Sequence, residues 1–399
     1  MPLLPVGAWL TELTPQHDRF SMSLICDLPV GIGEAELLGT LAAVLDRHDV
    51  LRSRLVRGEG GCGWELEVSA PGSVPVAGLV RRVSCDGRWR SPGWRAVAAR
   101  ELDAALGGLD PAGGVMARFV WFDAGGGTAG RLLIVLHHFV VDGVSWRILL
   151  PDLAQAYARV REGRAAGLAG VGTSVRRWAH ALVEEAGRRG SELGYWRGVL
   201  GESEPVLGRR GLDPVVDTMA TVRTVRVVVP AGVTRALLTS VPAVFGGGVN
   251  DGLLAALGLS VARWRGRERV LVRLEGHGRE EVVVPGADLS RTVGWFTSMF
   301  PVRLDVSGVD VDEAFAGGGA AGRVVKAVKE QLLAVPDRGV GFGLLRYLHP
   351  VAGGELARAA QPQIGFNYLG RFSASDMPEE LRGLGWTQVG EFDEIEAGL

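Results

Sequence analysis

Short β-patterned runs alternate with helix-patterned segments along the whole chain, and this alternation occurs in two comparable halves. In the first half, an apolar run at 20–28 precedes a helical pattern at about 34–47. Further β-rich runs at 116–122 and 132–138 precede a helical pattern after Ser145. A chain of 399 residues exceeds the size at which one hydrophobic core usually stops growing. The order therefore predicts a mixed α/β fold with two lobes.

The second half repeats the α/β theme after a polar, proline-containing stretch at 201–215 that we interpret as the crossing between lobes. Pro151 falls in the helical pattern after Ser145, and a helix tolerates proline only near its first turn. The remaining expected elements are listed here in chain order: a helix at 174–188, a β-rich run at 221–229, helices at 233–241 and 250–263, strands at 269–274 and 299–304, a helix at 322–333 and a strand at 363–369.

The composition excludes several classes of protein. Hydrophobic residues make up 47% and charged residues 22%, which is ordinary globular usage. A net charge of -2 without a long Lys/Arg run gives no field for attracting nucleic acid. Cys26, Cys62 and Cys85 have neither disulfide-framework nor zinc-ligand spacing, which fits a reducing cytoplasm. No leader segment or membrane-spanning apolar stretch is expected.

The sharpest local motif is HHxxxDG, in which His137 and His138 end an apolar strand and Asp142 follows before a helix. A strand-to-loop exit can aim one imidazole into a cleft, and imidazole titrates near neutral pH, as proton transfer requires. Spacing alone fits equally well a core histidine pair with Asp142 as a helix cap. Because strand side chains alternate, only one of the two histidines faces any given cavity.

A second motif, Glu275-Gly276-His277-Gly278-Arg279-Glu280, closes another apolar strand. Its glycines permit close approach of the main chain to a ligand, and its carboxylates are candidate bases. An ordinary charged turn facing solvent has the same composition. No group of histidines has metal-ligand spacing, so we expect no metal site.

Six motifs together resemble the condensation superfamily of nonribosomal peptide synthetases, and specifically its epimerization branch. HHFVVDGVSW alone indicates the superfamily, whereas EGHGRE, RTVGWFT and FNYLG narrow the resemblance to epimerization. Phe300 departs from the pattern, since the family usually has tyrosine there, and the entry segment 4–10 matches only in part. The motifs span nearly the whole chain: HHFVVDGVSW at 137–146, NDGLLAALG at 250–258, EGHGRE at 275–280, RTVGWFTSMFPV at 291–302, PDRGVGFG at 336–343 and FNYLG at 366–370.

The resemblance implies two chloramphenicol-acetyltransferase-like lobes, 1–200 and 201–399, in a V-shaped pseudodimer with a tunnel between them. It implies reversible L-to-D epimerization of the α-carbon of an aminoacyl or peptidyl thioester. His138 and Glu275 match the family's proton-transferring pair, and the resemblance does not assign which takes the proton in the L-to-D direction. The supporting or structural positions are His137, Asp142, Arg279, Asn367 and Tyr368.

The resemblance also implies partners. The substrate arrives on the phosphopantetheine arm of a peptidyl carrier protein domain, with adenylation and condensation domains as expected neighbours and no cofactor bound by this domain itself. No nucleic acid or membrane partner is expected. Two alternatives stay open: a condensation domain that joins two carrier-bound substrates through an amide, and a non-catalytic recruitment domain of the same superfamily. The second alternative predicts loss of the HHxxxDG histidines, and both are present.

Overall fold

The contacts within the chain divide it into two compact units. The computed structural model describes residues 1–58, 63–125, 127–213, 215–370 and 377–389. The first unit comprises Met1–Glu184, Glu281–Thr297 and Leu369–Leu399, and the second comprises Glu185–Glu280 and Ser298–Tyr368. This division differs from contiguous lobes at 1–200 and 201–399. The reason is that two later segments hydrogen-bond to elements of the first unit, as Trp386 does through its N–H to the Asp27 carbonyl at 2.6 Å.

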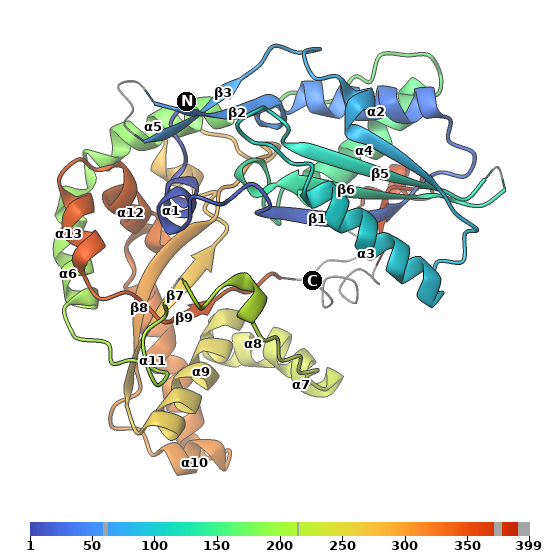
Figure 1. Cartoon of the computed structure of the whole chain (residues 1–399). Helices are drawn as coiled ribbons and strands as arrows, with labels where there is room; N and C mark the ends of the chain where they lie inside the picture. Colours follow the sequence, from blue (N-terminus) through green and yellow to red (C-terminus); the bar gives the residue numbers. More distant parts are fainter. Residues whose placement is uncertain (59–62, 126, 214, 371–376, 390–399) are drawn as a thin grey trace. The chain divides into compact units, whose positions relative to one another are not determined.

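The first unit contains a five-stranded sheet in the order β10-β1-β6-β5-β4 (Figure 1). β4 and β5 pair in parallel, and the other neighbours are antiparallel. The strands are β1 Ser21–Asp27, β4 Val80–Ser84, β5 Ala117–Asp123, β6 Arg131–His137 and β10 Thr387–Gln388, with a separate hairpin of β2 Ser53–Arg57 and β3 Trp64–Val68. The helices are α1 Pro5–Leu13, α2 Glu34–Arg47, α3 Pro92–Leu106, α4 Trp146–Val160 and α5 Val175–Ala186.

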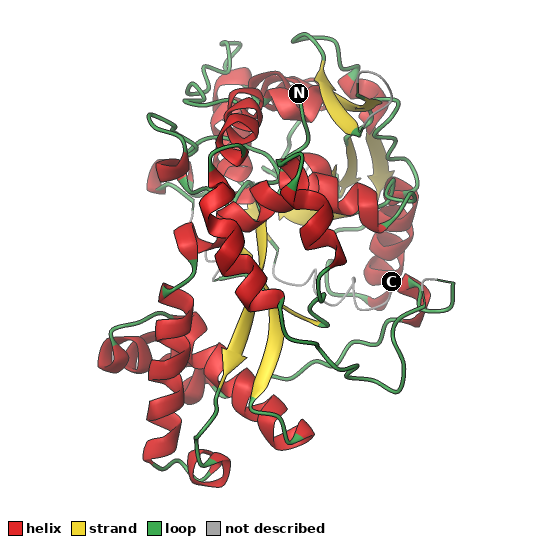
Figure 2. Cartoon of the chain, turned by 90° about the vertical axis from the view of Figure 1, so that its left-hand side faces the viewer, coloured by secondary structure: helices red, strands yellow, loops and turns green. Residues whose placement is uncertain are grey.

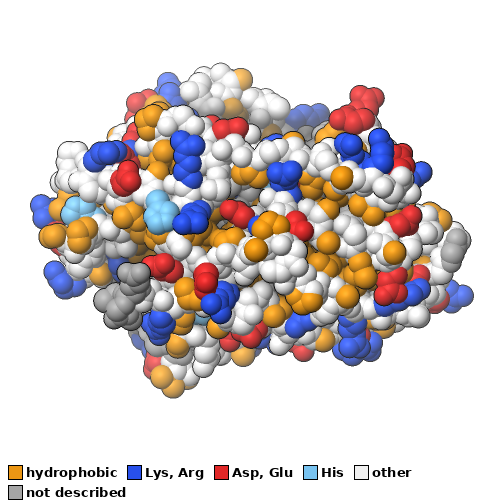
Figure 3. Space-filling view, turned by 90° about the horizontal axis from the view of Figure 1, so that it is seen from above, with side chains coloured by type: hydrophobic (Ala, Val, Ile, Leu, Met, Phe, Trp, Pro, Cys, Tyr) orange, Lys and Arg blue, Asp and Glu red, His pale blue; other side chains and the backbone are white. Residues whose placement is uncertain are grey.

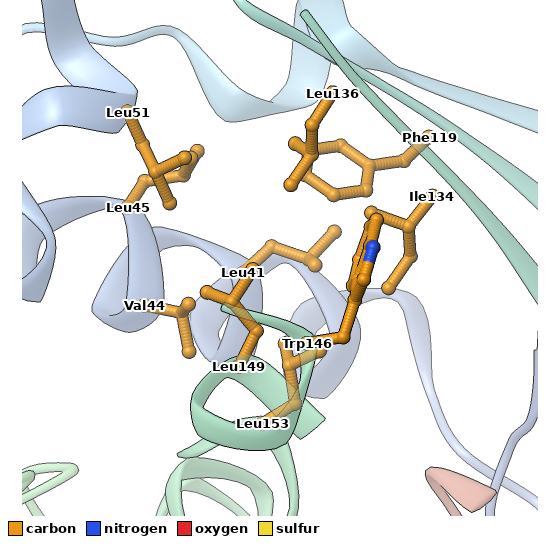
Figure 4. Close-up of a pocket in the computed structure, with 10 residues that line it drawn as sticks. All are labelled: Leu41, Val44, Leu45, Leu51, Phe119, Ile134, Leu136, Trp146, Leu149 and Leu153. Atoms are coloured by element: carbon orange, nitrogen blue, oxygen red, sulfur yellow. The ribbon is translucent and has the colours of Figure 1, made fainter. Parts of the chain in front are cut away.

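The central strand β6 is buried along its whole length, because both faces of the sheet are covered by helices. Leu133 and Val135 belong to a core with α3, whereas Ile134 and Leu136 point toward α2 and α4 (Figures 1 and 4). Between α2, α4 and the sheet lies a small cavity of about 20 Å³ lined entirely by apolar side chains. Strand alternation thus gives β6 two apolar faces, and His137 is the last residue of this central strand before the turn His138–Val140.

Pro151 lies inside α4 and not in its first turn, contrary to the sequence expectation. Proline lacks the N–H that would bond to the carbonyl four residues earlier. That residue is Arg147, which is exposed. The helix continues through the proline to Val160.

Segment 281–297 is held in the first unit by hydrogen bonds to the loop before α5 and by an ion pair with α4. The Thr173 N–H donates to the Asp288 carbonyl at 2.8 Å, and the Thr292 hydroxyl donates to the Thr173 carbonyl at 2.7 Å. Asp152 of α4 is fully buried and pairs with both His48, at 2.9 Å, and Arg291. A buried carboxylate needs such partners, because desolvation otherwise opposes its charge.

The second unit contains a three-stranded sheet in the order β8-β7-β9, flanked by helices (Figures 1 and 2). β7 pairs antiparallel with β8 and parallel with β9, and its apolar side chains pack with α9 and α11 in one core. The strands are β7 Arg269–Gly276, β8 Ser298–Asp305 and β9 Ile364–Phe366. The helices are α6 Leu193–Leu200, α7 Ala231–Arg235, α8 Val241–Phe245, α9 Val249–Arg265, α10 Val311–Phe315, α11 Gly319–Leu333, α12 Val340–Gly343 and α13 Ala352–Arg358.

The β-rich run expected at 221–229 is not a strand in the structure. Residues 222–229 are irregular, and Val225, Val227 and Val228 are largely exposed. The residue pattern has strand propensity, but a strand also needs a hydrogen-bonding partner, and no described strand pairs with this run. The strand expected at 363–369 is likewise shorter than its pattern.

Charges of both signs share one face of the molecule, and two of the cysteines are described as free thiols. Figure 3 shows Lys and Arg side chains interspersed with Asp and Glu over the visible face. Cys26 is a buried free thiol and Cys85 is also free, while Cys62 lies outside the described residues. Among the described helices, none is by itself long and apolar enough to cross a bilayer, and Ala231–Phe245 and Val249–Arg265 pass that test only as a pair bent by 100°.

The Asp152 cluster gives a prediction about stability. Asp152→Ala leaves His48 and the Arg291 guanidinium without their shared carboxylate, so we expect the free energy of unfolding to fall by about 3–5 kcal/mol. Scanning calorimetry measures the loss and resolves the transitions if the two units unfold separately. Asp86→Ala, which removes a largely exposed carboxylate of the same unit, should cost less than about 1 kcal/mol. An Asp152→Ala transition as stable as that of the control would contradict the role of this cluster.

Candidate functional site

The His137 ring is buried and hydrogen-bonded within the protein. This residue ends β6, is fully buried, and uses both ring nitrogens within the protein. Its Nδ1 accepts from the Phe139 N–H at 3.2 Å, so Nε2 carries the proton and donates to the His17 carbonyl at 2.8 Å. Burial lowers the pKa of His137 to about 4, which keeps the ring neutral. The bonded ring fixes the turn that follows.

His138 opens that 3-10 turn, His138–Val140, and is only partly buried. Its imidazole lies against two aromatic rings, with centroid distances of 5.2 Å to Phe20 and 4.2 Å to Trp295. Burial among them lowers the pKa of His138, while main-chain groups of the turn and the negative charge of Asp142 oppose the shift. A neutral imidazole at neutral pH is the form that accepts a proton.

Asp142 is buried, and its carboxylate accepts hydrogen bonds from two separate stretches of chain. Oδ1 accepts from the Ser145 N–H at 2.8 Å and from the Ser145 hydroxyl at 2.7 Å. Oδ2 accepts from the Phe296 N–H at 3.1 Å. This carboxylate therefore ties the HHxxxDG loop to segment 281–297.

Glu275 lies near the end of β7 and is partly buried. Leu274 pairs with Phe366 of β9, so the following residues Glu275 and Asn367 are neighbours. The Asn367 side-chain amide donates to Glu275 Oε2 at 2.8 Å. Burial raises the pKa of Glu275, and Arg273 opposes that shift. A carboxyl with a raised pKa is a better base once ionised and a usable acid at higher pH.

The glycines of the EGHGRE motif have specific structural reasons. Gly278 has φ +66, a conformation that favours glycine, and a Cβ at Gly276 would meet the Ser298 hydroxyl at 2.9 Å. Beyond them, the Glu280 carboxylate lies 3.4 Å from His277 and 3.3 Å from Arg338. The turn is thus ordered by one ion pair within the motif and one to Arg338.

Phe300, which stands where the family usually has tyrosine, packs against the PDRGVGFG motif. Gly339 has φ +84, and a Cβ there would lie 2.1 Å from the Phe300 ring. Only glycine permits this contact. The ring therefore packs on the main chain of the motif, and no phenolic hydroxyl is present at this position.

The structure brings the predicted site residues together in two groups. His137, His138 and Asp142 share one loop of the first unit, and Glu275 and Asn367 are hydrogen-bonded in the second, with Tyr368 next to Asn367 in sequence and partly exposed. Arg279 lies in the turn after β7 and is partly buried. The described residues contain no group of three or more His, Cys, Asp or Glu that could hold a metal ion.

Sequence reasoning did not single out Phe20, Ser145 or Trp295, which surround His138 and Asp142. Ser145 and Trp295 were present within quoted motifs, but only as letters of a pattern. The available signal was the combination of an aromatic residue and adjacent small residues in RTVGWFT, which is typical of a turn packed closely against another element.

The sequence and the fold are similar to those of known proteins. The family model described as "Condensation domain" matches residues 124–394. A linear gramicidin synthase polypeptide of Brevibacillus parabrevis is 39% identical over 391 residues, which cover 96% of this chain but 5% of that protein. Surfactin synthase subunit 1 of Bacillus subtilis (strain 168) is 32% identical over 93% of this chain and 10% of that protein. The chain thus spans a small fraction of these curated relatives.

Two solved structures have the same fold. The epimerization domain from the third module of tyrocidine synthetase B matches with a TM-score of 0.79 and 27% identity, covering 94% of this chain and 82% of that one. The first condensation domain of the calcium-dependent antibiotic synthetase matches with a TM-score of 0.65 and 22% identity, covering 92% and 80%. The α/β architecture, the HHxxxDG loop and these matches agree, and the chain belongs to the condensation domain family.

Proposed function

We propose that this domain epimerizes the α-carbon of an aminoacyl or peptidyl thioester carried by a peptidyl carrier protein in nonribosomal peptide synthesis. The observation that carries the proposal is Glu275, a partly buried carboxylate with a raised pKa, held by Asn367 in the EGHGRE turn. The motifs EGHGRE, RTVGWFT and FNYLG support the epimerization branch. The match to a solved epimerization domain at 27% identity supports it further.

The chemistry requires three functions. A base removes the α-proton, a donor stabilises the enolate oxygen of the thioester, and an acid returns a proton to the opposite face of the same carbon. We assign proton transfer to His138 and Glu275, which exchange the roles of acid and base with the direction of reaction. Asn367 and Tyr368 are candidates for positioning the thioester. At the end of one turnover the base has gained a proton and the acid has lost one, and proton exchange with water restores both groups. The total charge of the pair and all oxidation states are unchanged.

The proposed partners follow from the substrate. The thioester is presented on the phosphopantetheine arm of a carrier domain, and adenylation and condensation domains are the expected neighbours in a synthetase. The curated relatives, which are far longer than this chain, support a multidomain setting. This domain itself is proposed to bind no cofactor, and its setting is proposed to be the cytoplasm.

Glu275→Gln tests the base. The amide keeps the size of the side chain but removes the basic carboxylate, so we expect exchange of the α-proton with deuterated water to fall by about 10²- to 10⁴-fold. Mass spectrometry of the thioester released from a loaded carrier domain measures deuterium uptake. Glu268→Gln, just before the other end of β7 and exposed, is the matched control and should exchange like the wild type.

Two outcomes would count against different parts of the proposal. Exchange by Glu275→Gln at the wild-type rate would remove Glu275 as a base. A wild-type domain that shows no deuterium uptake, but forms an amide when offered a second loaded carrier, would be a condensation domain.

Alanine substitutions at His137 and His138 should have different effects, one on stability and the other on exchange. His138→Ala removes a proton-transfer group that is partly exposed, so we expect a folded protein with exchange reduced by about 10²- to 10⁴-fold. His137→Ala leaves the His17 carbonyl and the Phe139 N–H without their buried partner, so we expect a loss of about 1–3 kcal/mol in the free energy of unfolding. Exchange assays and thermal unfolding of both variants measure the two effects. A folded His138→Ala with normal turnover would contradict the assignment.

A further inference from the structure

Three rings meet at His138. The imidazole is nearly parallel to Phe20, with an interplanar angle of 23°, and tilted by 38° to Trp295. The Phe20 and Trp295 centroids are themselves 5.6 Å apart, so each ring contacts the other two. Trp295 is only 5% exposed and Phe20 is 38% exposed. Trp295 is therefore the buried ring of this group, and Phe20 is the ring that faces solvent.

The main chain on both sides of Trp295 is bonded to the loop that carries His138. Before it, the Gly294 N–H donates to the Ser145 hydroxyl at 3.2 Å. After it, the Phe296 N–H donates to Asp142. The Ser145 hydroxyl has one proton, and its oxygen lies 2.7 Å from Asp142 Oδ1 but 3.1 Å from the Gly294 carbonyl. The hydroxyl therefore donates to Asp142 and accepts from the Gly294 N–H. The indole thus has little freedom to move away from the imidazole.

Gly294 makes this approach possible. A Cβ at Gly294 would lie 2.9 Å from the Phe296 ring and 3.0 Å from Val175. A larger residue there would have to displace the Phe296 ring or the Val175 side chain, and the turn that carries Trp295 would shift with it. The sequence Gly294-Trp295-Phe296 therefore places one large ring between two anchored peptide groups.

We propose that Trp295 is a positioning residue that sets the orientation of the His138 imidazole, and that Asp142 and Ser145 hold Trp295 in place. This inference rests on the proposed function of His138 in proton transfer. It assigns to the aspartate of HHxxxDG a role at a distance from the imidazole, because the carboxylate anchors the turn that carries the indole.

The indole also removes water from one side of the imidazole, in agreement with the lowered pKa of His138. Among the described titratable neighbours in the first unit, none accounts for that direction by repelling the charged imidazolium. Asp142 raises the pKa, and His17 contacts His137 and Phe139. In the segment that carries Trp295, Arg291 is paired with Asp152, and Asp288 bonds to Ser290. Loss of the indole should therefore raise the pKa of His138 toward its ordinary value.

Trp295→Ala and Trp295→Phe test the inference, with Trp89→Phe, which alters a Trp–Trp contact beside α3, as the matched control. If the indole positions the imidazole, Trp295→Ala should lower kcat for deuterium exchange on the order of 10²-fold, as misplacement of a reacting group does, with little change in KM. Trp295→Phe keeps a ring and should recover most of that loss. Ser145→Ala leaves all three rings intact and should give a smaller loss in kcat. Trp89→Phe should exchange like the wild type.

A second measurement does not depend on turnover. NMR of protein labelled at its seven histidines, with the His138 signal assigned by its absence from His138→Ala, gives the pKa of His138 directly. We expect a higher pKa in Trp295→Ala, an intermediate value in Trp295→Phe and no change in Trp89→Phe. An unchanged His138 signal and pKa in Trp295→Ala would overturn the inference, even if turnover fell through a general loss of structure. A wild-type domain without exchange activity would instead count against the proposed function, and the NMR comparison would still decide this inference.

Discussion

The hydrogen bonds that Asp142 and Ser145 make to the turn at 294–296 are the constraint on which the His138 region depends. They join stretches of chain 149 and 154 residues apart. These bonds are buried, so breaking one leaves an unsatisfied polar group away from water, which costs more than the bond itself contributes. Asp152 and Thr173 extend the same connection along segment 281–297. The result is a loop whose conformation is fixed from outside its own sequence.

Burial acts in opposite directions on the two groups to which we assign proton transfer. It lowers the pKa of the His138 imidazole, whose charged form is a cation, and raises the pKa of the Glu275 carboxyl, whose charged form is an anion. The two values therefore move toward one another from their ordinary positions of about 6.5 and 4.3. Closer values suit a reversible reaction in which each group acts as acid in one direction and as base in the other.

Many of the helices and strands could be predicted from the residue pattern. The alternation along β6 gave the strand and its two apolar faces, and the change of period after Ser145 gave α4. The same alternation separated His137 from His138, which the structure places in different environments. The prediction of a strand at 221–229 was wrong because the residue pattern reflects only strand propensity, whereas strand pairing depends on residues elsewhere in the chain. The expected position of Pro151 near the first turn was also wrong, because α4 begins at Trp146 and continues through the proline.

The sequence by itself determined the α/β class, the motifs of the condensation superfamily and the residue types available for proton transfer, because these depend on local periodicity and on side-chain chemistry. Only the tertiary structure decided that segment 281–297 packs with the first unit, that Trp295 and Phe20 contact His138, and that Asn367 holds Glu275. Each of these joins residues far apart in the chain. Such contacts are selected by the burial and hydrogen bonding of the whole fold, and no local pattern of residues encodes them.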